Sequence, residues 1–324
     1  MNDAAIIEAL ERRALRRQER RDFFRSAGAL AAGAAAAATL GGEMGLATSA
    51  QAQTSAPTDA DVFNFALNLE YLEANFYNFA VNGVPISSSN PALVSGVGTP
   101  GQATGGRQVA FSDPVVQAYA RQLVHDELGH ITFIRSQLGA AAIAQPAIDL
   151  GASPTSAFSL AAQSAGAVGA GQSFDPYAND INFLLATFLF VEVGTSAYLG
   201  GAGLITNKTY LEAAAGILAV EAYHSGIARS LLYSKGQAMP SAITNANGIS
   251  DARDSLDGPT DDDLPLTQNG QPILVNADPS TSIAFPRTAG ATLNIAFLTK
   301  AAATKGGFFP NGVNGTLNTS TAEP

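Results

Sequence analysis

Four long stretches of the chain carry apolar side chains at the three- and four-residue spacing of an α-helix. The first is apolar on nearly every side, which is typical of a helix buried among other helices. Asp113 and Pro114 form a start signal for the second, because proline fits the first turn of a helix. We therefore predict an all-α fold, with helices at about residues 59–82, 113–138, 176–199 and 207–234.

The segments between and after these helices are rich in small and polar residues. Residues 83–112 are rich in Gly, Ser, Pro and Asn, and residues 139–173 in Ala, Gly and Ser, with a short helix predicted near 155–166. After the fourth helix, Asn, Asp, Gly, Pro and Thr dominate, and Asn269-Gly270 is a turn signal. Two short apolar runs there, PILV and LNIAF, either pair as strands or cover the helices.

The N-terminal segment has the pattern of an export signal. Arginines precede the apolar stretch SAGALAAGAAAAATLGG, and Ala50-Gln51-Ala52 has the form of a cleavage site. Arg20-Arg21 followed by Phe23 is similar to a twin-arginine signal. The alternative is a short amphipathic helix with an Ala-rich linker. We expect three parts: a twin-arginine-type signal peptide at 1–52, a four-helix bundle at 53–235, and a C-terminal extension at 236–324 that packs on the bundle.

Composition and charge narrow the classes of partner. Hydrophobic residues make up 46% of the chain and charged residues 14%, which favours a sizeable core over disorder. No cysteine is present, which excludes disulfides, thiolate metal sites and cysteine nucleophiles. Without residues 1–52, the 17 basic and 27 acidic residues fall to 10 and 21, a net charge of −11. Such a surface repels nucleic acid, so we predict no nucleic-acid partner, and no membrane span in the mature chain.

The chain holds two Glu-x-x-His motifs, although it has only three histidines. Glu127 and His130 lie in the second predicted helix, and Glu221 and His224 in the fourth. Residues three apart share a helix face, so each motif directs a carboxylate and an imidazole to one point. Both motifs lie on apolar stripes, where a buried carboxylate without a partner is costly. A metal cation is therefore the expected partner.

The other two predicted helices each carry a glutamate on the corresponding stripe, Glu70 and Glu192. Four carboxylates and two divalent ions neutralise each other, and oxygen ligands with imidazole suit iron or manganese. This order of residues matches the known pattern of di-iron and di-manganese carboxylate bundles. Core histidines paired with acids, or a bundle that no longer binds metal, are the alternatives. The predicted metal ligands are Glu70, Glu127, His130, Glu192, Glu221 and His224.

Four further residues lie close to these predicted ligands. His125 lies roughly 160° around the helix from Glu127, so it should face away from the metal site. Asp126 either hydrogen-bonds a ligand histidine or is a solvated acid. Glu73 lies roughly 60° from Glu70, as an alternative ligand or a supporting acid. Tyr77 either touches the site or belongs to the core.

Several of these segments resemble the ferritin-like superfamily. They are LNLEYLEANFY, DELGH, FDPYANDINFLLATFLFVEVG and VEAYH, and the resemblance covers about residues 58–235. The tail segments AFPRTAGATLNIAF and GGFFPNGVNG are similar to its exported, desiccation-related branch. This resemblance implies a ferritin-like antiparallel four-helix bundle with an irregular C-terminal extension, and the same six metal ligands. The cysteine-bound iron module of rubrerythrins is not present.

The resemblance leaves more than one function open. It implies an exported protein with a dinuclear metal site, for which iron is the first choice of metal and manganese the second. The protein would be redox-active or would bind iron in a stress or desiccation context. Such a site would make the protein a di-metal oxidoreductase acting on O2 or peroxide. A dimanganese catalase and a structural stress protein without turnover are the alternatives. Localisation in the periplasm or secretion through the twin-arginine route follows from the N-terminal pattern, and assembly as a homo-oligomer stays open.

Overall fold

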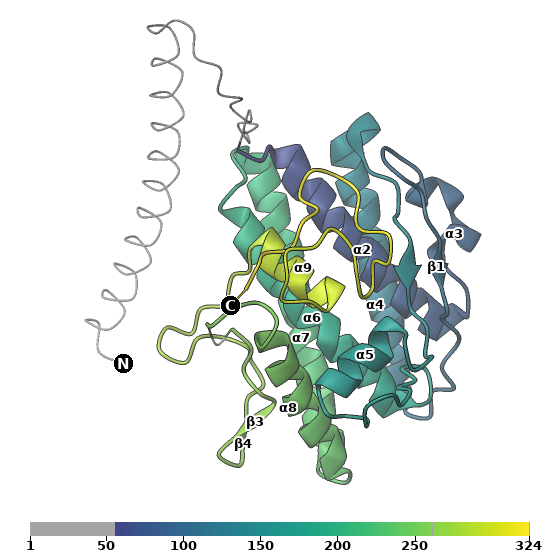
Figure 1. The fold of residues 1–324 in the computed structure, drawn as a ribbon, viewed down its shortest axis with the longest axis vertical. Coiled ribbons are helices and arrows are strands. Elements are labelled where there is room, and N and C mark those ends of the chain that lie inside the picture. The colour runs from purple at the N-terminus through teal and green to yellow at the C-terminus, as the bar shows by residue number, and fades with distance from the viewer. Residues whose placement is uncertain (1–55, 261, 324) are drawn as a thin grey trace, which may run out of the picture. The chain divides into compact units, whose positions relative to one another are not determined.

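The computed structural model describes residues 56–260 and 262–323, so the arginine pair and the expected cleavage site lie outside the described residues. Four long helices form a bundle (Figure 1): α2 (Asp59–Asn82), α4 (Pro114–Leu138), α6 (Asp180–Ala202) and α7 (Lys208–Gly236). Helix α2 packs mainly on α4, and α6 mainly on α7. The short turn between α6 and α7 makes them antiparallel neighbours. The prediction of an all-α helical bundle is confirmed.

Side-chain caps explain where the bundle helices begin. Thr58 and Asp61 form a capping box at the start of α2. Asp113 caps α4 just before its first-turn proline, as the sequence predicts. Helix α6 begins later than the predicted residue 176, because Asn179 accepts a hydrogen bond from the backbone N–H of Asn182 and acts as its cap.

Shorter elements lie in the two loops that precede α4 and α6. They are α3 (Ile86–Ser89), 3-10 turns at Pro91–Val94 and Gly139–Ala141, β1 (Ala103–Thr104), β2 (Ile148–Asp149) and α5 (Ala157–Ser164). The two strands pair in parallel, with Ala103 opposite Ile148, and so join the two loops. Helix α5 is the short helix that the sequence predicts near residues 155–166.

The C-terminal part contains two further helices and one hairpin: α8 (Pro240–Asp254), β3 (Thr267–Gln268), β4 (Gln271–Pro272) and α9 (Ala289–Phe297). Asn269 and Gly270 both have positive φ and close the hairpin, as the turn signal predicts. The LNIAF run is helical and belongs to α9, so of the two alternatives it covers the bundle rather than forming a strand.

Helix α8 was not predicted from the sequence. Its buried face consists of small residues, one isoleucine and one charge, so its hydrophobic periodicity is weak: Ala242, Ala246, Ile249, Ser250 and Arg253. Asn and Gly in its interior also lower helix propensity. Packing against α6 and α7 therefore decides that this segment is helical.

A group of aromatic rings joins the extension to the bundle. Phe76 of α2 lies against Phe158 of α5 and Phe190 of α6, with ring centroids 5.1 and 5.7 Å apart. Phe308, from the segment after α9, lies 5.0 Å from Phe158 and 4.9 Å from Phe190. Each such pair contributes about 0.5–1.5 kcal/mol beyond the apolar area it buries. The extension is thus part of the same core.

Helix α6 is the one helix among the described residues that is long and apolar enough to cross a membrane. Its most apolar window is 83% buried inside the protein. A helix at the centre of a bundle has this composition for the same reason as a membrane span, because nearly every face meets other apolar groups.

Candidate metal centre

Three bundle helices bring four of the predicted ligands together: Glu70 of α2, Glu127 and His130 of α4, and Glu221 of α7. One ligand atom from each lies within 4.8 Å of the others, and all four residues are buried. His130 is central, with its Nδ1 atom 3.3 Å from Glu70 Oε2, 3.4 Å from Glu127 Oε2 and 3.5 Å from Glu221 Oε1. We call these four residues the Glu/His cluster.

His224, the histidine of the second motif, lies beside this cluster. Its Nδ1 atom is 3.4 Å from Glu127 Oε1 and 4.0 Å from Glu221 Oε1. Its Nε2 atom is 3.0 Å from Asp126 Oδ2. With the proton on Nε2, His224 donates to Asp126 and turns the Nδ1 lone pair toward the cluster. Asp126 therefore orients a candidate ligand, which is one of the two roles that the sequence left open.

His125 points away from the cluster, as its position on the helix predicts. Its side chain is 82% exposed, and its Nδ1 atom lies 3.0 Å from Asp126 Oδ1. The two histidines of the HDELGH segment therefore have different surroundings, with His125 in solvent and His130 in the core.

Glu73 is the second acid of α2 and is buried next to the cluster. A Cβ atom added to Gly194 of α6 would lie 3.1 Å from Glu73 Oε1 and 2.8 Å from Glu221 Oε2. These two carboxylates therefore meet at the same point of α6, where glycine leaves room for them. The Tyr77 hydroxyl donates to Glu73 Oε2 over 3.0 Å. Tyr77 thus touches the site through Glu73.

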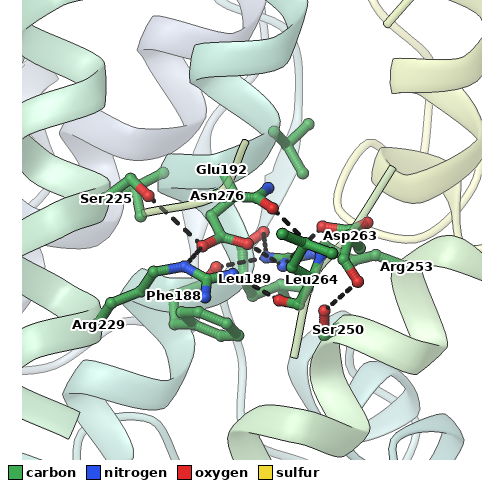
Figure 2. A network of polar contacts seen from close by, with 12 residues as sticks. Phe188, Leu189, Glu192, Ser225, Arg229, Ser250, Arg253, Asp263, Leu264 and Asn276 are labelled. Atoms are coloured by element: carbon green, nitrogen blue, oxygen red, sulfur yellow. Dashed lines mark hydrogen bonds and ion pairs between the residues drawn. The ribbon is translucent and has the colours of Figure 1, made fainter. Parts of the chain in front are cut away.

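Glu192 is the predicted ligand that the structure does not bring to the cluster. Its carboxylate lies between two buried guanidinium groups, those of Arg229 on α7 and Arg253 on α8 (Figure 2). The reason is helical geometry: Gly194 faces the cluster, and Glu192, two residues earlier, lies roughly 160° around α6 from it. The structure corrects the predicted set, since Glu73 rather than Glu192 supplies the fourth carboxylate near the cluster.

Glu192 resembles Glu70 in the sequence because both lie on apolar stripes. What distinguishes Glu192 is that two arginines pair with it. Arg253 lies on a helix that the sequence did not predict, and Arg229 lies on the same helix as Glu221. Both guanidinium groups are also near the ring of Phe188, with distances to its centroid of 4.8 Å for Arg253 and 5.2 Å for Arg229.

The acid groups of the site repel each other in a poorly solvated core. Burial and the neighbouring carboxylates raise the pKa of Glu127 and Glu221 well above the usual range. Burial and the charge of Glu70 raise the pKa of Glu73 to about 8. Burial opposes ionisation of Glu70 too, but the charge of His130 together with hydrogen bonds to His130, Glu127 and Tyr198 lowers the pKa of Glu70. The protein therefore holds protons here when no other cation is present.

The pKa values of His130 and His224 are shifted in opposite directions. Burial disfavours the charged form of His130, but the charges of Glu70 and Glu221 raise its pKa to about 9. Burial lowers the pKa of His224, although Asp126 acts against it. A neutral imidazole is the form that binds metal, so His224 is already close to that form.

The donor atoms of the site fit a bound cation. In the described part of the chain, six buried atoms around the cluster have no hydrogen bond of acceptable geometry: Glu70 Oε2, Glu127 Oε1 and Oε2, His130 Nδ1, Glu221 Oε2 and His224 Nδ1. Buried polar atoms nearly always have partners, so a group of six without them needs an explanation. A metal ion would be a partner for all of them, and carboxylate oxygens with imidazole nitrogens suit iron or manganese.

The bundle and its buried Glu/His cluster define a ferritin-like protein, and the comparison with protein families agrees. The sequence model of the ferritin-like domain matches residues 58–234, and the chain belongs to that family. The desiccation-related protein PCC13-62 of Craterostigma plantagineum is 34% identical over 245 residues, which cover 71% of this chain and 75% of the relative. The ferritin-like resemblance and its desiccation-related branch, expected from the motifs, are thereby confirmed.

A second curated relative has an enzymatic name. The ferritin-like catalase Nec2 of Nesocodon mauritianus is 27% identical over 271 residues, which cover 80% of this chain and 84% of the relative. No solved structure gives a significant match.

Proposed function

We propose that the protein binds two divalent metal ions, iron or manganese, and that the loaded protein reacts with O2 or peroxide. The observation that carries this proposal is the set of buried donor atoms without hydrogen-bond partners around the Glu/His cluster. Glu70, Glu127, His130 and Glu221 would hold the ions, together with Glu73 and His224. Two divalent ions would balance the four carboxylates, and so remove the repulsion that raises their pKa values.

The bound ions would supply one-electron chemistry with oxygen or peroxide, which no side chain of this site offers by itself. The residues of the chain would orient the ligands, fix the proton of His224 and shield the site from water. Tyr198 donates to Glu70 Oε1 and fixes that carboxylate, and Tyr77 does the same at Glu73 Oε2. Asp126 Oδ2 accepts the hydrogen bond from His224 Nε2 and so keeps the proton on that nitrogen. Apolar side chains around the site exclude bulk water, which strengthens these interactions.

Peroxide disproportionation is the reaction favoured by a specific observation, the similarity to a relative named as a ferritin-like catalase. In that reaction two molecules of hydrogen peroxide give two of water and one of dioxygen. The similarity to a desiccation-related protein supports a role in water stress. Iron binding without turnover and a purely structural use of the ions are outcomes that the following experiment separates.

The test compares Glu221→Gln with Glu212→Gln. Glu212 is an exposed carboxylate on the same helix, so its replacement removes an equal charge away from the site. Metal content after loading with Fe2+ or Mn2+, followed by peroxide consumption and O2 release, is measured for both variants. We expect Glu221→Gln to bind metal at least about 10-fold more weakly, because a ligand is lost, and Glu212→Gln to match the unaltered protein. Full metal content in Glu221→Gln would contradict the assignment.

We further propose that the protein leaves the cytoplasm through the twin-arginine route. Support comes from the order of the arginine pair, the apolar stretch and the Ala-Gln-Ala site in residues 1–52. This route exports folded proteins, so metal would be loaded before export. Replacing Arg20 and Arg21 with lysine should strand the precursor inside the cell, as seen by its uncleaved N-terminus. Normal export of that variant would refute the route.

A further inference from the structure

A pocket with apolar walls lies next to the Glu/His cluster, between the bundle and the C-terminal extension. Leu69 and Leu72 of α2 and Val193 of α6 line its bundle side. Ile295 and Ala296 of α9, with Phe308, line the side formed by the extension. Glu73 is the one ionisable residue that lines this pocket.

Glu73 joins the pocket to the metal site. Its Oε1 atom and Glu221 Oε2 both lie beside Gly194, which also lines the pocket. A side chain at position 194 would begin within 3.1 Å of both carboxylates and would force them to shift. The pocket therefore ends at a group that we propose as a metal ligand, with only a glycine backbone at the junction.

We infer that this pocket is the passage through which dioxygen reaches or leaves the buried metal site, and that the C-terminal extension forms one of its walls. The inference rests on the proposed function, in which dioxygen is either consumed in metal oxidation or released from peroxide. In both cases it has to cross the protein around a buried site. Dioxygen is small, uncharged and apolar, so it enters apolar spaces that exclude ions and larger polar molecules.

A second pocket offers an internal comparison. Its lining includes Val62, Ala66, Ile205 and Ala214, and Tyr198 is the one ionisable side chain that lines it. The Tyr198 hydroxyl donates to Glu70, so the phenol ring stands between that pocket and the carboxylate. The first pocket has no such residue between its space and Glu73, which is why we assign the passage to it.

Paramagnetic relaxation by dissolved dioxygen tests the passage directly. Methyl relaxation is measured by NMR on the full chain supplied with Zn2+, a diamagnetic ion, under air and under O2 pressure. The methyl groups of Leu72, Val193 and Ala296 should relax several-fold faster under O2 than those of Leu123 and Leu232, which are fully buried and line neither pocket. Equal relaxation in the two groups would overturn the inference, and this measurement needs no variant.

A matched pair of variants then links the pocket to the reaction. Ala296→Leu places a larger side chain in the pocket, whereas Ala291→Leu adds the same group to the same helix at a partly exposed position that does not line it. Ala296→Leu should abolish the relaxation effect and slow the reaction of the Fe2+-loaded protein with O2 several-fold, with metal content unchanged. Ala291→Leu should change neither. An unchanged O2 rate in a folded Ala296→Leu protein with a filled pocket would refute the passage.

The two proposals fail in distinguishable ways. A protein that binds no metal but shows strong relaxation at Leu72 and Val193 refutes the proposed function, and with it any use of the pocket in that reaction. A protein that binds metal and reacts with O2, but shows no relaxation at these methyl groups, refutes the passage alone.

Discussion

Removing bound metal should lower the melting temperature strongly near pH 8 and much less near pH 5. The cause is the raised pKa of Glu73, about 8 in the folded protein against an ordinary value of 4.5. Between these two pH values the folded chain holds a proton that the unfolded chain has lost, so the metal-free protein loses stability as pH rises. Each such group contributes a slope of up to about 1.4 kcal/mol per pH unit.

Other titratable groups of the site also change the stability of the metal-free protein between pH 5 and pH 8. Glu127 and Glu221 also have raised pKa values, and His130, with a pKa of about 9, adds to the loss above its ordinary value of 6.5. Two groups act in the opposite direction because their pKa values are lowered. Glu70 does so only in acid near or below its ordinary value, and His224 does so below its ordinary value of 6.5, where it offsets part of the loss. Together they should lower the melting temperature of the metal-free protein by on the order of 10 °C between pH 5 and pH 8.

Thermal melts across this pH range, with chelator and with added Mn2+, measure the effect. The metal-loaded protein should show the opposite trend, because protons compete with metal for the same donors at low pH. Glu73→Gln without metal should have a flatter pH profile, since one of the titrating groups is gone. A metal-free protein that becomes more stable between pH 5 and pH 8 would show that the site does not hold protons.

The second large effect is expected at Glu192. Glu192→Gln should cost about 3–5 kcal/mol of unfolding free energy and leave metal content unchanged, because it removes the charge between two buried guanidinium groups. The side chains of Arg229 and Arg253 are 0% and 1% exposed, so water cannot replace the lost partner. Asp263 remains as a charged partner for Arg253, with its Oδ1 2.8 Å from the guanidinium. The other hydrogen bonds of Arg229 in the described part of the chain go to uncharged backbone carbonyls.

Urea unfolding and metal analysis of Glu192→Gln and Glu73→Gln together measure this difference. Glu73→Gln should show the reverse pattern, with weaker metal binding and a metal-free form no less stable than the unaltered protein. Its lost charge is one of several that repel each other, whereas that of Glu192 lies between two cations. If instead Glu192→Gln binds less metal while its unfolding free energy is unchanged, then Glu192 is a metal ligand, and the ion pairs in Figure 2 do not keep it out of the site.

Local patterns in the sequence determined the class of fold. The helix period, the cap at Asp113 and the Asn269-Gly270 turn act over a few neighbouring residues, so they can be recognised without a structure. The two Glu-x-x-His motifs are local for the same reason, because three residues of a helix bring two side chains to one face. The convergence of Glu70 with those motifs followed from the family resemblance and from the burial of each stripe.

Only the tertiary structure decided which residues complete the site. Whether Glu192 faces the cluster depends on the rotation of α6, and whether Glu73 faces it depends on the rotation of α2. A helix that is apolar on nearly every face carries no signal of its rotation. The choice depends on Gly194, which lets α6 approach the carboxylates, and on Arg253, which is brought to Glu192 from a helix of weak periodicity. Charge pairing and close packing between residues far apart in the chain have no local pattern. The sequence alone therefore identified the two Glu-x-x-His motifs and the candidate glutamates, but not which of these glutamates lie together in the folded protein.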